Sequence, residues 1–469
     1  MKTYKKIVFL FSFALIFSCE NRLDVIPEDN VASSTVFSSF ATINGAVVGI
    51  YSKNQSGDLN GMAQLMSDFM SDNVNFVGSF PSLQEVDQFA TLATNTSIDN
   101  IWLDGYELIG AANSIIVNLP EVTEVTGLTD EDKTRFIGEA KFLRALTYFQ
   151  LVNLFAQPYQ FSTGSNLGVP LVTKPFEGGD IAEFQLERSS VNEVHAFIEQ
   201  DLLDAIAALP EENGLRAEAG AARALLARLY LYRENWANAA NFADQVISSG
   251  NYALAANYDF YDANPGSSEN IFVVVNTPTD GPQENAGSDE TYVNFYNPSP
   301  GGRGDAPFSQ DLIDAFAAEA GDRRFDELSA AASDAGGNDT FFTTKYPDVV
   351  NNASDGMVLR MTEMYLIRAE ANFQDGTAVG DSPLNDINLL RTRAGLTALT
   401  TVDLDAILLE RRKELCFEGH RRMDLLRNNL NLRPDNGAVS APGANKVIFP
   451  IVEDETTNNP NITQNPGNF

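Results

Sequence analysis

The sequence predicts a mainly α-helical protein, a scaffold of tetratricopeptide-like helical hairpins joined to an irregular, loop-rich part that carries short strands. Two observations support this prediction. Long segments repeat apolar residues at three- to four-residue steps and stop at a proline, as amphipathic helices do. Residues 219–252 contain two such helices with alanines where they would touch and a short turn near Glu234 and Asn235, which is typical of a tetratricopeptide hairpin.

The first element along the chain is a targeting segment. Three lysines precede an apolar run that is shorter than the roughly 20 residues needed to cross a bilayer, so residues 1–18 are predicted to be a signal peptide. Cys19 follows a small serine, as in a bacterial lipobox, although Phe17 departs from the usual small residue there. We therefore expect Cys19 to be the lipid anchor, residues 19–35 a lipidated tether, and residues 36–469 a single domain.

Helical patterns dominate the next part of the chain, and the scaffold is expected mainly over residues 97–250 and 309–430. One helix should open at Thr129, which has an acid three residues on, and another at the capping box of Ser190 and Glu193. Helical hairpins bury their apolar faces only by stacking on their neighbours, so we expect a short solenoid.

The loop-rich part is expected mainly over residues 251–308, with a contribution from residues 60–96. Residues 251–308 are rich in glycine, proline, asparagine and aromatic residues, which breaks the helical period. The apolar run at residues 271–276 predicts a buried strand within them.

Residues 410–427 concentrate six cations in a chain whose formal net charge is -33 and whose pI is near 4.3. Such an acidic chain is a poor candidate for binding nucleic acid. Acids alternate with these cations at helical spacing, which predicts a packed helix laced with ion pairs. The expected pairs are Glu410 with Lys413, Glu418 with Arg421 and Arg422, and Asp424 with Arg427.

The sequence carries no recognisable motif for catalysis or metal binding. The two histidines, His195 and His420, lie far apart, and the chain has no phosphate-binding loop, nucleophile elbow or EF-hand loop. We therefore expect no catalytic residue, no metal ligand and no cofactor, while structural calcium stays open. Once Cys19 is acylated, Cys416 is the only thiol left, so no intrachain disulfide is expected.

Four features in order make the chain resemble the SusD/RagB family of outer-membrane nutrient-binding lipoproteins of Bacteroidota. They are Cys19 with Leu23, Asp24 and Pro27; the helix with Trp102, Tyr106, Ile109, Ala112 and Asn113; "GEAKFLRALTYFQLVNLFAQP" at 138–158; and residues 410–427 with "FPI" and "NPNITQNPG" behind them.

The resemblance implies four tetratricopeptide-like hairpins, with residues 410–427 as a scaffold signature. It also implies a lipid-anchored protein at the outer membrane, facing the exterior. Such a protein binds glycans without cleaving them and delivers them to a SusC-like TonB-dependent transporter. The alternatives are a peptide or another nutrient as ligand, or an extracellular glycan hydrolase.

Glycan binding needs flat apolar groups that stack on sugar rings and a few polar groups that fix hydroxyls, and loops are the natural place for both. Two loops combine these features, one before the Trp102 helix and one before the helix expected at residue 309. The predicted ligand-binding residues are Asn75, Phe76, Phe80, Tyr292, Phe295, Tyr296 and Arg303.

Overall fold

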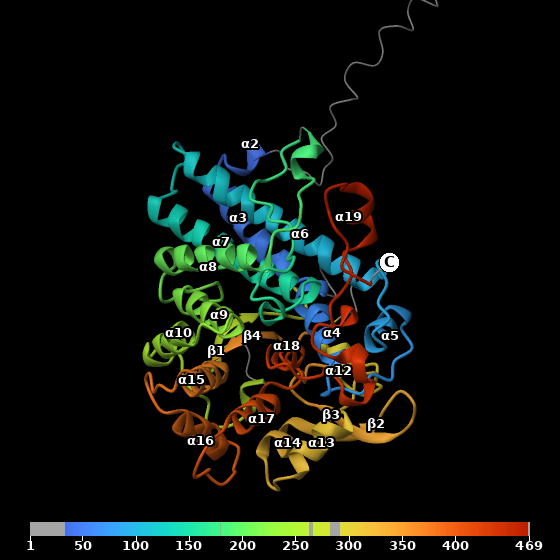
Figure 1. The fold of residues 1–469 in the computed structure, drawn as a ribbon. Coiled ribbons are helices and arrows are strands. Elements are labelled where there is room, and N and C mark those ends of the chain that lie inside the picture. The colour runs from blue at the N-terminus through green and yellow to red at the C-terminus, as the bar shows by residue number, and fades with distance from the viewer. Residues whose placement is uncertain (1–32, 179, 262–265, 282–290, 468–469) are drawn as a thin grey trace, which may run out of the picture.

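Most of the long helices stack side by side along one flank of the molecule, as Figure 1 shows for α6 to α10 and then α15 and α16. The structure is a computed structural model that describes residues 33–178, 180–261, 266–281 and 291–467. The expected signal peptide, the anchor Cys19 and nearly all of the tether therefore lie outside the described residues. No described helix is long and apolar enough to span a membrane.

The mainly α-helical fold class is confirmed. The long helices are α3 (Phe40–Asn54), α6 (Thr96–Asn118), α7 (Asp130–Phe155), α8 (Val191–Ala208), α9 (Ala219–Tyr232), α10 (Trp236–Ser248), α15 (Met361–Asp375), α16 (Pro383–Arg393) and α17 (Leu404–Leu415). The shorter ones are α2 (Ser33–Val36), α4 (Ala63–Phe69), α5 (Pro81–Asp87), α12 (Tyr292–Tyr296), α13 (Gln310–Ala317), α14 (Arg323–Leu328), α18 (Arg421–Arg427) and α19 (Glu453–Asn458).

The helix boundaries follow the capping signals of the sequence. The Thr129 hydroxyl accepts from the backbone N–H of Asp132, whose carboxylate accepts in return, and Ser190 and Glu193 form the same reciprocal pair. Each capping box satisfies backbone donors that would otherwise lack a partner in the first helical turn. Both predicted helix starts are confirmed.

The hairpin of α9 and α10 is also confirmed, with its turn at Glu234 in the left-handed region (φ 56°). Ala239, Ala240 and Ala243 of α10 are fully buried, so the two helices approach closely. The other face of α10 packs on α15, more than 100 residues later in the chain. The helical stack therefore continues across the irregular segment between them.

The strands form two separate antiparallel pairs. β1 (Asn270–Val274) pairs with β4 (Gly356–Arg360) and packs against α9, which confirms the buried strand expected near residue 271. β2 (Ser329–Ser333) and β3 (Asp339–Thr343) form a hairpin in which Ser333 lies opposite Asp339. Both pairs lie in or beside the loop-rich part.

Residues 410–427 do not form one helix, so that prediction was wrong. α17 ends at Leu415 and α18 begins at Arg421. Between them Phe417 (φ 64°) and Gly419 (φ 76°) occupy the left-handed region. A Cβ on Gly419 would lie 2.9 Å from the backbone of Gln64, so the close approach to that segment requires glycine.

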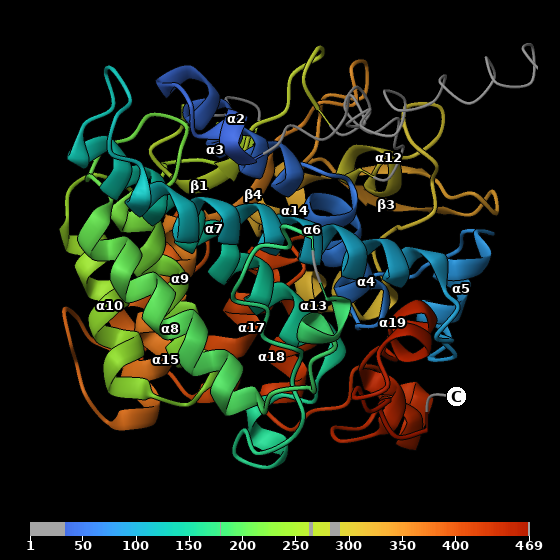
Figure 2. The ribbon, with the colours of Figure 1, turned by 90° about the horizontal axis from the view of Figure 1, so that it is seen from above.

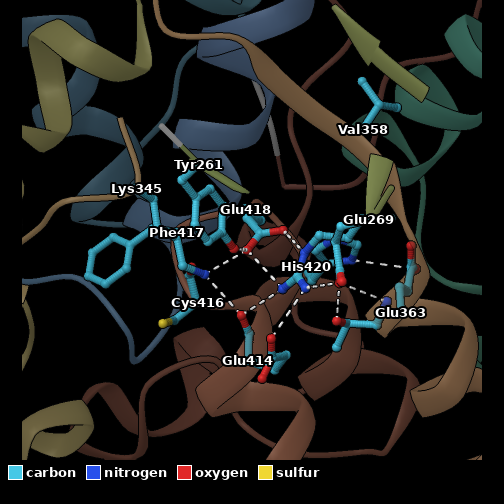
Figure 3. A network of polar contacts seen from close by, with 12 residues as sticks. Tyr261, Glu269, Lys345, Val358, Glu363, Glu414, Cys416, Phe417, Glu418 and His420 are labelled. Carbon is cyan, nitrogen blue, oxygen red and sulfur yellow. Dashed lines mark hydrogen bonds and ion pairs between the residues drawn. The ribbon is translucent and has the colours of Figure 1, made fainter. Parts of the chain in front are cut away.

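Three of the four expected ion pairs in this stretch were also wrong. Arg427 does bind Asp424, at 3.0 Å. Glu418 instead binds Arg360 at 2.8 Å and Lys345 at 2.6 Å, because the break between α17 and α18 turns it toward β4 (Figure 3). Arg412, Lys413 and Arg421 likewise bind acids far away in the sequence, whereas Arg411 binds Asp424 within the stretch. The prediction that ion pairs lace this stretch is confirmed, but most of the partner acids lie outside the same helical turn.

Candidate ligand-binding site

The two loops predicted to bind ligand meet in the structure, although more than 200 residues separate them in the sequence. A β-bridge joins Val74 to Phe308, and the backbone N–H of Val77 donates to the carbonyl oxygen of Asp305 at 2.8 Å. Gly78 allows this contact, because a Cβ there would lie 2.7 Å from the Asp305 carboxyl carbon. The pairing gives the loops a defined position relative to each other.

The exposed part of this site is built around Phe80 and Arg303. Phe80 is 40% exposed and directly precedes Pro81, the first residue of α5, so its backbone is fixed at a helix start. The Arg303 guanidinium lies 5.5 Å from the Phe80 ring centroid and 5.0 Å from that of Phe295, and its Nε donates to Asp305 at 2.6 Å. Asn75, in the same loop as Phe80, is also exposed. These groups offer one aromatic face, one guanidinium and one amide to solvent.

The other four predicted contacts are buried, which corrects their assignment as ligand platforms. Phe76 packs on Phe69 with ring centroids 4.7 Å apart, and Tyr296 donates its hydroxyl to Asp68 at 2.5 Å. Tyr292 stacks on Tyr346 at 4.7 Å. Because α12 turns its three aromatic residues inward and Phe76 packs into the core, all four support the loops rather than present a face to ligand. The four are Phe76, Tyr292, Phe295 and Tyr296.

Two further loops border the loop that carries Arg303, and no sequence pattern predicted them. Val350 is almost fully exposed. Its neighbour Val349 packs against Gly301, where an added Cβ would lie 3.1 Å from the Val349 side chain. The backbone N–H of Ala335 donates to the carbonyl oxygen of Gly304 at 2.9 Å. Two adjacent valines suggest buried chain rather than an exposed loop. We call residues 75–80, 299–305, 334–338 and 347–352 the loop cluster.

The loop cluster gathers at one end of the molecule. Figures 1 and 2 both place α5, α12 and the β2–β3 hairpin together, away from α8 to α10. The loop cluster is therefore built on α5, α12 and the hairpin, at a distance from the stacked helices α8 to α10.

Directly beneath the loop cluster lies a buried acid, Asp68. Burial raises its pKa to about 7, and the hydrogen bonds from Tyr296 and the Gly419 amide only partly oppose that effect. Asp68 is therefore close to half-ionised at neutral pH, which makes this layer sensitive to pH.

A second group of charges, the buried charge cluster, joins β4 to α17 and the segment after it (Figure 3). Arg360 binds Glu269, Glu414 and Glu418 at 3.3, 3.2 and 2.8 Å. Burial alone would raise the pKa of Glu418, yet the charges of Arg360 and Lys345 hold that pKa well below its ordinary value. With these side chains buried, the cluster serves as scaffold.

The two histidines and Cys416 are buried. Burial lowers the pKa of His195 to about 3 and that of His420 to about 4, and raises that of the Cys416 thiol to about 11. Within the described residues no group of three or more histidine, cysteine or acidic side chains could hold a metal ion. Neither histidine is placed to act as an exposed acid, base or ligand.

Sequence comparison decides the family. Residues 22–231 match the family described as "Starch-binding associating with outer membrane", SusD-like, and residues 328–467 match the SusD family, SusD/RagB. The chain belongs to the SusD/RagB family. The resemblance read from the sequence motifs is thereby confirmed.

Relatives and solved structures of SusD-like proteins match over nearly the whole chain. SusD-like protein P25 of Formosa agariphila is 27% identical over 98% of this chain and 99% of its own length, and the starch-binding protein SusD of Bacteroides thetaiotaomicron is 26% identical over both complete chains. A laminarin-binding SusD-like protein superposes with a TM-score of 0.76 at 28% identity, covering 92% of this chain and all of its own. A SusD superfamily protein of Bacteroides vulgatus gives a TM-score of 0.81 at 26% identity, with the same coverage.

Proposed function

We propose that this SusD-like protein binds glycans at the loop cluster, is anchored in the outer membrane through Cys19, and delivers its ligand to a SusC-like TonB-dependent transporter. The exposed Phe80 ring beside the partly exposed Arg303, where the two loops meet, is the observation that carries the binding site. Family membership and relatives whose names give starch and laminarin as ligands support a glycan.

The chemistry of the loop cluster suits a sugar. An exposed aromatic face stacks on the apolar face of a pyranose ring, and the guanidinium and amide beside it hydrogen-bond hydroxyls. Phe80 supplies the first, and Arg303 and Asn75 supply the second. Since the loops are already paired with each other, little conformational entropy would be lost on binding.

The carboxylates of the loop cluster favour binding over bond cleavage. Asp305 is buried and accepts from the Arg303 guanidinium, while Asp334 and Asp348 each accept hydrogen bonds from a nearby asparagine, Asn338 and Asn351. A general acid needs a carboxyl free to give a proton to the leaving group. These three acids are occupied by local contacts, which supports a capture protein.

Calorimetric titration of residues 20–469 with plant, algal and microbial polysaccharides tests the proposal, with product analysis of each mixture. We expect binding without new reducing ends. Phe80→Ala should weaken binding about 10-fold, from loss of stacking worth roughly 1.4 kcal/mol, with an unchanged melting temperature. Phe176→Ala, an exposed phenylalanine outside the loop cluster, is the matched control and should bind as the wild type does.

Each other outcome of the titration has a definite meaning. Cleavage products would make the protein a hydrolase, and equal affinity of the Phe80→Ala variant would move the site away from this loop. Failure to bind any polysaccharide, with binding of peptides instead, would overturn the glycan ligand. Co-purification of a TonB-dependent transporter from outer membranes tests the partner separately.

A further inference from the structure

We propose that Arg412 and Arg421 are positioning residues for ligand binding, which hold the loop carrying Phe80 by clamping Asp72 and Asn73 at its base. The expected effect on ligand affinity rests on the proposed function. The expected effect on the position of the loop does not. The clamp gives two scaffold cations a role that sequence spacing did not suggest.

The contacts at the base of the loop are dense and directional. Arg421 donates from Nε and Nη2 to the two carboxylate oxygens of Asp72, at 2.7 and 2.8 Å. Arg412 donates from Nη2 to the Asp72 carbonyl at 2.7 Å and from Nε to the Asn73 side-chain oxygen at 2.8 Å. A paired, planar guanidinium fixes orientation as well as distance. Two residues of the loop are thus held by the junction of α17 and α18.

Ser309 holds the same two residues from the other side. Its hydroxyl donates to the Asp72 carbonyl at 2.6 Å, and its backbone N–H donates to the Asn73 carbonyl at 2.9 Å. The next residue, Val74, forms the β-bridge to Phe308. The clamp therefore sets the register in which the two ligand loops pair, and that pairing places Phe80 beside Arg303.

The far end of the same loop is held by a third arginine, Arg433, which follows residues 410–427 in the chain. Arg433 donates from Nε to the carbonyl of Ser71 at 3.1 Å and from Nη2 to the Asp87 carboxylate at 2.6 Å. Asp87 is the last residue of α5, the helix that begins directly after Phe80. Segment 71–87 is thus pinned at both ends while its exposed middle carries the aromatic face.

The exposure of the two cations separates this clamp from the deep scaffold. The side chains of Arg412 and Arg421 are 11% and 12% exposed, whereas Arg411 and Arg422, their sequence neighbours, are completely buried. Water can reach the clamp if one partner is removed, so its loss should be tolerated by the fold. We therefore expect loss of the clamp to increase the mobility of the loop without a comparable fall in the free energy of unfolding.

The double variant Arg412→Gln, Arg421→Gln tests the clamp, with Arg223→Gln as the matched control. Arg223 binds Glu211 through two hydrogen bonds of 2.9 and 2.7 Å outside the loop cluster. Hydrogen–deuterium exchange of peptides covering residues 74–80 should become at least 10-fold faster in the double variant. Exchange in α7 should stay unchanged, and the control should behave as the wild type throughout.

Glycan affinity provides the second measurement, in a cycle with Phe80→Ala. The double variant should bind the glycan identified for the wild type about 5-fold more weakly, and this loss should disappear when Phe80 is already alanine. A purely structural role would weaken binding equally in both backgrounds.

The results separate the two proposals. Unchanged exchange at residues 74–80 overturns the clamp, and so does a loss of affinity that persists without the Phe80 ring. Faster exchange in a protein whose wild type binds no glycan would leave the clamp standing as a loop anchor and overturn the proposed function.

Discussion

The buried charge cluster and the loop cluster are built from the same chemical groups, arginines beside carboxylates and aromatic rings, yet they differ in burial and in the number of partners each arginine has. Arg360 is buried among three glutamates and lies 5.8 Å from the ring of Phe260. Arg303 is 32% exposed, has one carboxylate partner in Asp305, and lies over two phenylalanine rings. Burial and the number of partners, rather than residue type, separate scaffold from binding site.

The difference has an energetic reason. A buried charge has lost its hydration and depends on every partner, so the fold tolerates little change around it. An exposed arginine keeps part of its hydration and can exchange water for a ligand hydroxyl at small cost. Substitution should therefore damage folding in the buried charge cluster and ligand binding in the loop cluster.

The largest effect should come from Glu418→Gln, which keeps the shape of the side chain and removes its charge. Arg360 and Lys345 would then be buried short of a counter-charge, so the free energy of unfolding should fall by about 3–5 kcal/mol. Chemical denaturation measures the change. Glu107→Gln, which removes the exposed partner of Lys53, should cost less than about 1 kcal/mol. Equal losses in the two variants would contradict the contrast.

A smaller, pH-dependent effect is expected at Asp68, beneath the loop cluster. Its pKa is raised from 3.8 to about 7 by burial, so the stability it contributes is complete below about pH 4 and is lost as the pH rises through 7. Asp68→Asn removes this dependence while keeping an acceptor for Tyr296. Between pH 4 and pH 8 the variant should gain roughly 2–4 kcal/mol relative to the wild type. Denaturation curves at four pH values measure the gain, and a constant difference would place the pKa near its ordinary value.

The scaffold was largely predictable from the sequence because its signals are local. Capping residues such as Thr129 and Ser190 act within one helical turn, and the alanines of α10 report close packing without knowledge of the partner. Residues 410–427 mark the limit of such signals. Their helical spacing was read correctly as paired charge, but the break at Phe417 and Gly419 depends on contacts with distant residues.

The site was predictable only in part, because exposure is a tertiary property. The sequence identified both loops that meet, yet Tyr296 and Phe80 look alike as loop aromatics. Only the fold shows that Asp68 draws the Tyr296 hydroxyl inward while Pro81 holds Phe80 at the surface. Val350 was missed for the same reason, since nothing local distinguishes an exposed valine from a buried one.

The smallest effect, Arg303→Lys, bears most directly on how the loop cluster recognises its ligand. Lysine keeps the charge next to Asp305 but loses the planar group that lies over Phe80 and Phe295. We expect a 2- to 5-fold loss of glycan affinity, or about 0.5–1 kcal/mol, measured by calorimetry. Arg323→Lys, an exposed arginine paired with Glu327 on α14, should leave affinity unchanged. A loss above about 50-fold would mean that the guanidinium binds an anionic group of the ligand through two hydrogen bonds. The affinity of the wild type would then fall steeply with added salt, because that contact would be an exposed ion pair.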